Sequence, residues 1–234
     1  MWIDDQILTD YKKNNSCKIW TPQNTIVVVG RGNRIDQECF TQKCTEQKVE
    51  IKRRYGGGGA VVLHDQCLII SLGLWVKDFF QNDLYFEKIN DAIIDTFIPI
   101  NHTFRNLEKK GISDIAYKNK KLVGSSMFRS RNYLLFQASI LYDNKIALIN
   151  EYLKHPSKEP DYRKNKTHQE FLTSVKEIYK DLSLLELEKT FKDNFIKHVL
   201  SKFQDDLLDS IIQQHSALEK RLQNSVQKDR FSFL

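Results

Sequence analysis

Short apolar runs alternate with polar or glycine-rich turns along the first two thirds of the chain, a pattern typical of strands. One helix interrupts them before Pro99, where apolar residues recur at helical spacing. The expected strands lie at residues 25–29, 49–54, 60–63 and 68–74, the helix carries Leu84, Ile89, Ile93 and Phe97, and an antiparallel meander follows at 114–117, 121–124, 133–142 and 146–149.

After Pro156 and Pro160 the pattern indicates helices alone. Thr167 and Glu170 form a capping box at the start of the first of them. The apolar stripes of the expected helices are Phe171, Val175 and Ile178, then Leu184, Leu187, Phe191, Phe195, Val199 and Phe203, and finally Leu207, Ile211, Leu218 and Leu222. Loops separate the stripes after a few turns, which favours core packing over a coiled coil. We expect one domain over residues 1–234, sheet-rich at 1–156 and helical at 157–234.

Composition and charge narrow the class of protein. A hydrophobic fraction of 41% with 28% charged residues is that of a folded chain, and the net charge of +6 is basic without being extreme. The acidic first ten residues lack the positive start of an export signal, and His64 and Asp65 interrupt the most apolar stretch, 60–76. We therefore expect a soluble protein of the cytoplasm or an organelle matrix, with no membrane partner. The four cysteines lack zinc-site spacing and are interpreted as free thiols.

Four of the nine glycines are consecutive, at positions 56–59, between two expected strands. A flexible hairpin would need only two of them, whereas a longer run lets backbone N–H groups approach a ligand closely. Arg53 and Arg54 precede the run, separated from it by Tyr55 alone, and favour an anion or carboxylate site. No Gly-Lys-Ser/Thr follows, which excludes a P-loop, and no helical pattern opens as a Rossmann turn would require.

Several motifs follow one another in a recognisable order. They are Ile19-Trp20, residues 27–33, Glu38-Cys39, residues 53–61 with His64-Asp65, residues 113–115, residues 120–126 and Arg129. In this order and spacing the chain resembles the lipoate-protein ligase and octanoyltransferase family. The resemblance implies an α+β fold of the biotin and lipoate ligase type, a mixed, largely antiparallel sheet flanked by helices, with a helical C-terminal part. The chain departs from the family at Gln137-Ala138, where His-Gly is usual, by an extra residue before His64, and in residues 1–11, which lack the family's first-helix pattern.

The resemblance also assigns residues to the site. Lys121 takes the place of the family's essential lysine, where an ammonium would stabilise the carbonyl and phosphate oxygens of an acyl-adenylate. Asp114 takes the acidic position on the metal and nucleotide side and is the candidate Mg²⁺ ligand. The other residues expected to bind substrate or adenylate are Arg54, Gly57, Gly58, Gly59, Ala60, Gly124, Ser125 and Arg129. Without the resemblance, Lys121 and Arg129 read as solvated surface charges and Asp114 as a turn cap.

The implied reaction uses ATP and Mg²⁺ to activate lipoate or octanoate as an acyl-adenylate and transfers the acyl group to a lipoyl-domain protein. Family members of the acyltransferase branch need a cysteine near or beyond the lysine, but all four cysteines precede residue 68. The adenylate route is therefore favoured. The chain resembles a catalytic domain without the accessory domain of two-domain ligases, so a small accessory partner is also expected. A transferase using a preformed acyl donor and an inactive lipoate-binding homologue remain as alternatives. A nucleic-acid binder has only the net charge in its favour, so no nucleic-acid partner is expected.

Overall fold

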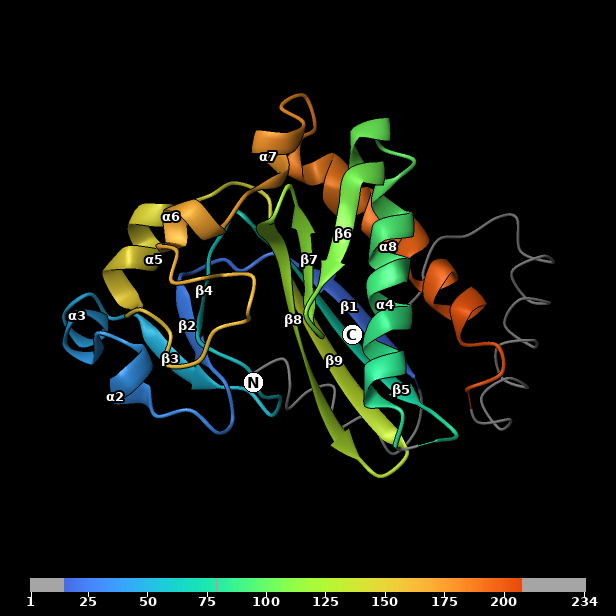
Figure 1. Cartoon of the computed structure of the whole chain (residues 1–234), viewed down its shortest axis with the longest axis horizontal. Coiled ribbons are helices and arrows are strands. Elements are labelled where there is room, and N and C mark those ends of the chain that lie inside the picture. Colours follow the sequence, from blue (N-terminus) through green and yellow to red (C-terminus); the bar gives the residue numbers. More distant parts are fainter. Residues whose placement is uncertain (1–14, 79, 208–234) are drawn as a thin grey trace.

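A six-stranded antiparallel sheet lies at the centre of the molecule (Figure 1), in the computed structural model that describes residues 15–78 and 80–207. Its strands, in spatial order, are β1 (Ser16–Trp20), β5 (Cys67–Trp75), β9 (Tyr133–Leu141), β8 (Lys120–Ser130), β7 (Asp114–Tyr117) and β6 (Leu107–Lys110). Each neighbouring pair is antiparallel. The strands expected at 68–74 and from 114 to 142 are thereby confirmed.

A smaller sheet of three strands packs beside the first, in the order β3 (Glu50–Arg53), β2 (Ile26–Val29) and β4 (Val61–Leu63). β2 is parallel to β3 and antiparallel to β4, so this sheet makes the whole arrangement mixed. The glycine run joins β3 to β4 across both edges of the small sheet, because β2 lies between them. No hairpin forms at the run, and its glycines serve a crossing loop instead.

Two long helices, α4 (Asn82–Phe97) and α8 (Leu184–Lys202), cover one face of the large sheet (Figure 1). Both predicted apolar stripes turn into the main core, except for Leu84, which is half-buried and lies outside it. The stripe residues Ile89, Ile93 and Phe97 of α4 and Leu187, Phe191, Phe195 and Val199 of α8 are fully buried. A buried side chain of this kind contributes about 1.5–3 kcal/mol, so the two helices fix this face firmly. The small sheet and the candidate site lie on the opposite face of the large sheet.

The shorter helices differ from the sequence expectation in two places. Ile146 begins helix α5 (Ile146–Tyr152) instead of a strand, because Ile149 and Leu153 follow at helical spacing and pack on the small sheet. A short apolar run is compatible with either period, and burial against the neighbouring sheet decides between them. The remaining short helices are α2 (Ile35–Glu38), α3 (Thr41–Glu46), the 3₁₀ turn η1 (His102–Asn106), α6 (His168–Phe171) and α7 (Val175–Ile178).

The helix expected over 167–178 is split into α6 and α7. Thr167 and Glu170 form the predicted capping box of α6. The helix then stops, because Leu172 pairs with Lys121 and the Thr173 N–H donates to the Lys121 carbonyl at 2.9 Å. The last expected stripe, beyond Leu207, and residues 1–11 lie outside the described residues. Within the described ranges, no helix combines the length and the apolar character needed to cross a membrane.

Candidate active site

Lys121 faces a cavity because β8 carries a bulge at this point. Ile115 pairs with Val123 and Ala116 pairs with Lys121, which leaves Leu122 as the extra residue. The bulge places Lys121 and Gly124 on the same side, where a Cβ at Gly124 would lie 2.7 Å from the lysine Nζ. The glycine therefore leaves the space that the lysine side chain occupies. Lys120, by contrast, is exposed.

Asp114 of β7 holds the ammonium of Lys121. Its Oδ1 lies 2.8 Å from Lys121 Nζ, and its side chain is only 7% exposed. The hydroxyl of Tyr162 donates to the other oxygen, Oδ2, at 2.8 Å. Burial and the neighbouring Asp114 carboxylate raise the pKa of Tyr162, so the hydroxyl keeps its proton. The structure thus brings two predicted residues together and adds a third that the sequence did not suggest.

Arg54 holds the glycine loop in place through hydrogen bonds to its carbonyl groups. It is buried, and its guanidinium donates to the Gly57 carbonyl at 3.0 and 2.6 Å and to the Gly59 carbonyl at 2.8 Å. Gly58 adopts φ +88°, which favours glycine. Arg54 lines the cavity as expected, but its donors are engaged by the loop backbone. In this structure it holds the loop through the carbonyls of Gly57 and Gly59 and so positions the glycine N–H groups.

Arg53 anchors the loop that follows β2, a role that its place in the sequence did not indicate. Its Nη1 donates to the carbonyls of Gly30, Arg31 and Asn33 at 2.9, 3.0 and 2.8 Å. Arg53 is the last residue of β3 and Arg54 follows it directly, so the two consecutive side chains point to opposite sides and fix two different loops. The only sequence signal was the Arg-Arg pair itself.

A cavity of about 560 Å³ opens between the two sheets, a size usual for small-molecule sites. The predicted residues on its wall are Arg54, Gly57, Gly58, Gly59, Ala60, Asp114, Lys121, Gly124 and Ser125. The Ser125 hydroxyl donates to the Ser113 carbonyl at 2.6 Å and so ties β8 to the turn before Asp114. A smaller, mostly apolar pocket of about 100 Å³ adjoins the cavity and shares Lys121 with it. Leu122, Leu141, Ile149 and Phe171 line this smaller pocket.

Arg129 is not brought to the cavity. Beyond the bulge β8 alternates regularly, so Gly124 and Ser126 face the cavity while Arg129 points to the α4 side. Its guanidinium lies 5.4 Å from the ring centroid of Tyr85 and donates to the Asp78 carbonyl at 3.2 Å. Burial lowers the pKa of Arg129. The expectation that Arg129 contacts the adenylate does not fit this position, because its side chain lies on the face of β8 opposite the cavity.

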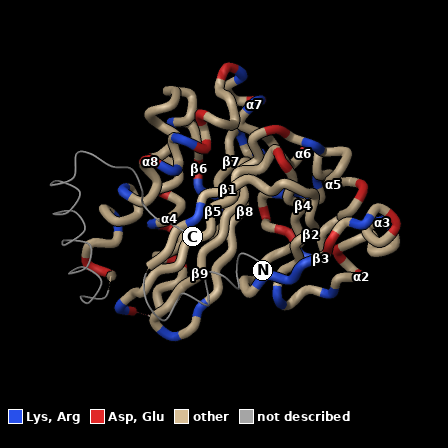
Figure 2. The backbone as a smooth tube through the Cα atoms, turned by 180° about the vertical axis from the view of Figure 1, so that it is seen from behind, with Lys and Arg blue, Asp and Glu red and all other residues tan. Residues whose placement is uncertain are grey.

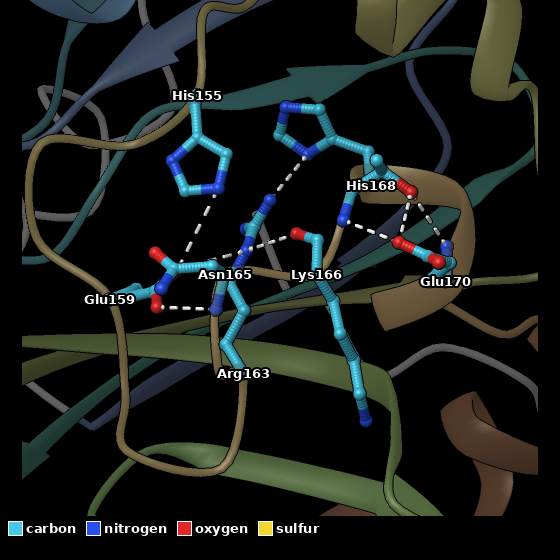
Figure 3. Close-up of polar contacts among 8 residues, drawn as sticks. His155, Glu159, Arg163, Asn165, Lys166, His168 and Glu170 are labelled. Atoms are coloured by element: carbon cyan, nitrogen blue, oxygen red, sulfur yellow. Dashed lines mark hydrogen bonds and ion pairs between the residues drawn. The ribbon is translucent and has the colours of Figure 1, made fainter.

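A segment between α5 and α6, which no sequence motif indicated, forms another wall of the cavity. Figure 3 shows the polar contacts within this segment. At its centre the buried Arg163 donates from Nε to the Lys166 carbonyl at 3.1 Å and lies 3.5 Å from Glu159 Oε2. Its Nη2 lies 3.4 Å from His168 Nδ1. Burial is the main cause that lowers the pKa of both Arg163 and His168. The sequence marked this segment only by two prolines, which say nothing about its contacts.

The family model described as the lipoyl protein ligase A/B catalytic domain matches residues 1–196. The chain belongs to this family. A probable lipoate-protein ligase A of Mycoplasma pneumoniae is 27% identical over 187 residues, which cover 77% of this chain and 53% of that protein. An inactive lipoate–protein ligase 2 of Plasmodium falciparum is 26% identical over 204 residues, covering 74% and 53%. The chain thus spans about half the length of these curated relatives.

Solved structures of the lipoyl protein ligase family share the fold. A bipartite lipoate protein ligase of Thermoplasma acidophilum, described with its E2 lipoyl domain, superposes with a TM-score of 0.70 at 17% identity, covering 97% of this chain and 92% of that one. An ATP-bound lipoate-protein ligase A superposes with a TM-score of 0.67 at 19% identity, covering 95% and 87%. The α+β fold implied by the sequence motifs is thereby confirmed.

Proposed function

We propose that this chain activates lipoate or octanoate with ATP as an acyl-adenylate and transfers the acyl group to a lysine of a lipoyl-domain protein. The observation that carries the proposal is the position of Lys121, at the junction of the large cavity and the small apolar pocket. The small pocket would take the acyl chain and the large cavity the adenylate. A carboxylate at the junction would then lie beside the ammonium.

Lys121 would act in both half-reactions. In the first, a carboxylate oxygen attacks the α-phosphorus of ATP and pyrophosphate leaves. In the second, the acceptor amine attacks the carbonyl carbon of the mixed anhydride and AMP leaves. Negative charge builds up on the phosphate oxygens in the first step and on the carbonyl oxygen and the leaving AMP phosphate in the second, and a positioned cation stabilises it in both. The N–H groups of the loop at Gly57, Gly58 and Gly59 are suited to bind the same oxygens.

The cysteines favour the adenylate over a thioester on the enzyme. A thiolate is the nucleophilic form of cysteine, and burial raises the pKa of all four thiols, of Cys17 and Cys67 to about 12 and of Cys39 to about 11. All four are buried. None of them lines either pocket.

The partners follow from the same proposal. The ATP bound by the ligase A neighbour and the lipoyl domain described with the Thermoplasma ligase support ATP and a lipoyl-domain acceptor here. The bipartite nature of the latter supports a small accessory protein. Mg²⁺ commonly uses one or two carboxylates together with substrate phosphates, and Asp114 supplies a carboxylate on the cavity wall. Asp114 is therefore the residue that would hold the metal accompanying ATP.

A second candidate is a lipoate-binding protein without turnover. Gln137 lines the cavity where the family usually has histidine, and the Plasmodium falciparum relative is described as inactive. Such a protein would bind lipoate and release no pyrophosphate. A transferase would modify the acceptor only when it receives a preformed acyl donor.

One experiment separates these functions. The full chain is incubated with lipoate, Mg²⁺ and a lipoyl-domain acceptor, with ATP, without ATP, or with chemically prepared lipoyl-adenylate. We expect pyrophosphate release and a lipoyl mass increment on the acceptor in the ATP arm, read by intact mass. Modification in the lipoyl-adenylate arm alone would identify a transferase. Calorimetric binding of lipoate without product in any arm would identify the inactive binder.

A further inference from the structure

Tyr162 contacts the candidate catalytic pair from outside the strands that carry it. Its hydroxyl donates to Asp114 Oδ2, while Asp114 Oδ1 receives the ammonium of Lys121. The two carboxylate oxygens are thus shared between one cation and one hydroxyl. Ser113 Oγ is a weaker neighbour of Oδ1, at 3.4 Å.

The backbone on both sides of Tyr162 is held in place. Next to it, Arg163 binds Glu159 and the Lys166 carbonyl (Figure 3). The Arg163 guanidinium also lies 4.8 Å from the centroid of the Phe171 ring. The ring of Tyr162 itself lies 5.0 Å from the ring of Phe171. These contacts restrict the position of the Tyr162 ring and hence of its hydroxyl. It is therefore built into the fold and is not a surface group that meets Asp114 by chance.

We propose that Tyr162 is a positioning residue for Lys121 and acts through Asp114. A carboxylate turns easily about its Cβ–Cγ bond, and the rotation would move Oδ1 away from the lysine. A fixed hydroxyl on Oδ2 opposes that rotation, so Lys121 Nζ stays at the junction of the two pockets. The role in catalysis rests on the proposed function, whereas the effect on the lysine does not.

The test variant is Tyr162→Phe, which removes the hydroxyl and keeps the ring on Phe171. A hydrogen bond to a charged group is worth roughly a tenfold change or more in an equilibrium or rate constant, so we expect kcat of adenylate formation to fall about tenfold. KM for lipoate should change little, because the variant keeps the ring that packs on Phe171 of the acyl pocket and loses only the hydroxyl bound to Asp114. Tyr117→Phe is the matched control, since it removes a hydroxyl from the strand of Asp114 and should leave kcat unchanged.

A double-mutant cycle distinguishes positioning from a general structural role. In the Asp114→Asn background, Tyr162→Phe should cost little further activity, because its effect passes through the carboxylate. Full additivity of the two losses would overturn the proposal. So would a normal kcat in Tyr162→Phe.

A readout independent of turnover follows the lysine directly. In protein labelled with ¹³C at lysine Cε, the Lys121 resonance is assigned by its loss in Lys121→Arg. We expect this resonance to shift or broaden in Tyr162→Phe and to stay unchanged in Tyr117→Phe. An unchanged resonance in Tyr162→Phe overturns the inference. If the resonance moves but the wild-type chain forms no adenylate, the positioning role stands and the proposed function fails.

Discussion

Lys121 forms an ion pair with Asp114, whose side chain is almost fully buried. Removing one partner of such a pair leaves an uncompensated charge inside the protein, which is more costly than the pair itself is favourable. Gly124 is part of the same arrangement, because any side chain there would meet the lysine. At the scale of single residues, function and stability are therefore coupled at Lys121.

Replacing Lys121 by alanine should reduce adenylate formation and also lower the stability of the fold. Loss of a positioned cation should cost about 3 kcal/mol of transition-state stabilisation, or roughly a hundredfold in rate. Because Asp114 loses its counter-ion, we also expect unfolding free energy to fall by about 1–3 kcal/mol. Pyrophosphate release and denaturant unfolding measure the two effects.

Two further variants separate these effects. Lys120→Ala removes the adjacent but exposed lysine and should retain both activity and stability. In the double variant Lys121→Ala, Asp114→Asn, the buried charge is gone, so stability should recover while activity stays low. Near-normal turnover in Lys121→Ala would show that the catalytic lysine has been assigned to the wrong position.

At the scale of elements, the two loops that follow β2 and β3 meet backbone to backbone. A Cβ at Gly30 would lie 2.0 Å from the carbonyl oxygen of Gly58, a distance that no side chain can occupy. The Arg31 N–H also donates to the Gly56 carbonyl at 2.9 Å. The loops are therefore interlocked, and Arg53 at the end of β3 and Arg54 directly after it each hold one of them.

Gly30→Ala should consequently displace the glycine loop. Since the clash is with backbone, the loops must separate, and we expect a loss of about 2 kcal/mol or more in unfolding free energy. ATP and lipoate binding by calorimetry should weaken as well. Gly32→Ala, in the same loop but with open space at its Cβ position, should behave like wild type in both measurements. Equal effects of the two substitutions would show that the close contact is unimportant.

The regular elements could be predicted because their periodicity is long and clear. β5, α4 and α8 follow their apolar patterns over many residues, and burial confirms them. The short elements could not, because tertiary contacts decide them: Leu172 ends α6 by pairing with Lys121, and packing on the small sheet makes 146–152 a helix. The position of Arg129 could not be predicted for a related reason. The face to which its side chain points depends on the alternation after the bulge in β8, and no sequence pattern marks that bulge.

At the scale of the whole molecule, the site is assembled from segments that are far apart in the chain. The glycine loop comes from the small sheet, Lys121 and Asp114 come from the large one, and Arg163 comes from the segment between α5 and α6. The glycine loop and the Lys121–Asp114 pair could be predicted from family motifs. The last could not, since only the packing of the two sheets brings the segment containing Tyr162 and Arg163 to the lysine.

Charge is unevenly distributed over the molecule. Figure 2 shows acidic and basic positions mixed over most of the backbone, with basic positions predominating along β3 and the loop beside it. Arg31 and Arg53 are exposed contributors, and Arg34 and Lys52 add charge that Asp36 and Glu50 partly balance. These residues lie beside the cavity, several of whose wall residues come from the same loops. An acidic acceptor would therefore be attracted towards the side of the molecule where acyl transfer is proposed to occur.

Acyl transfer to an acidic lipoyl domain should accordingly slow as salt is added. The net charge of +6 and the basic surface near the cavity steer the encounter, and this attraction is screened beyond about 8 Å at physiological ionic strength. We expect kcat/KM for the acceptor to fall about tenfold between low and high salt, normalised to adenylate formation in the same buffers. Lys158→Glu, at the cavity, should reproduce part of this loss, whereas the same change at Lys197 on α8, across the large sheet, should not. A flat salt dependence would refute charge steering, and equal losses in both variants would show that net charge matters more than its placement beside the cavity.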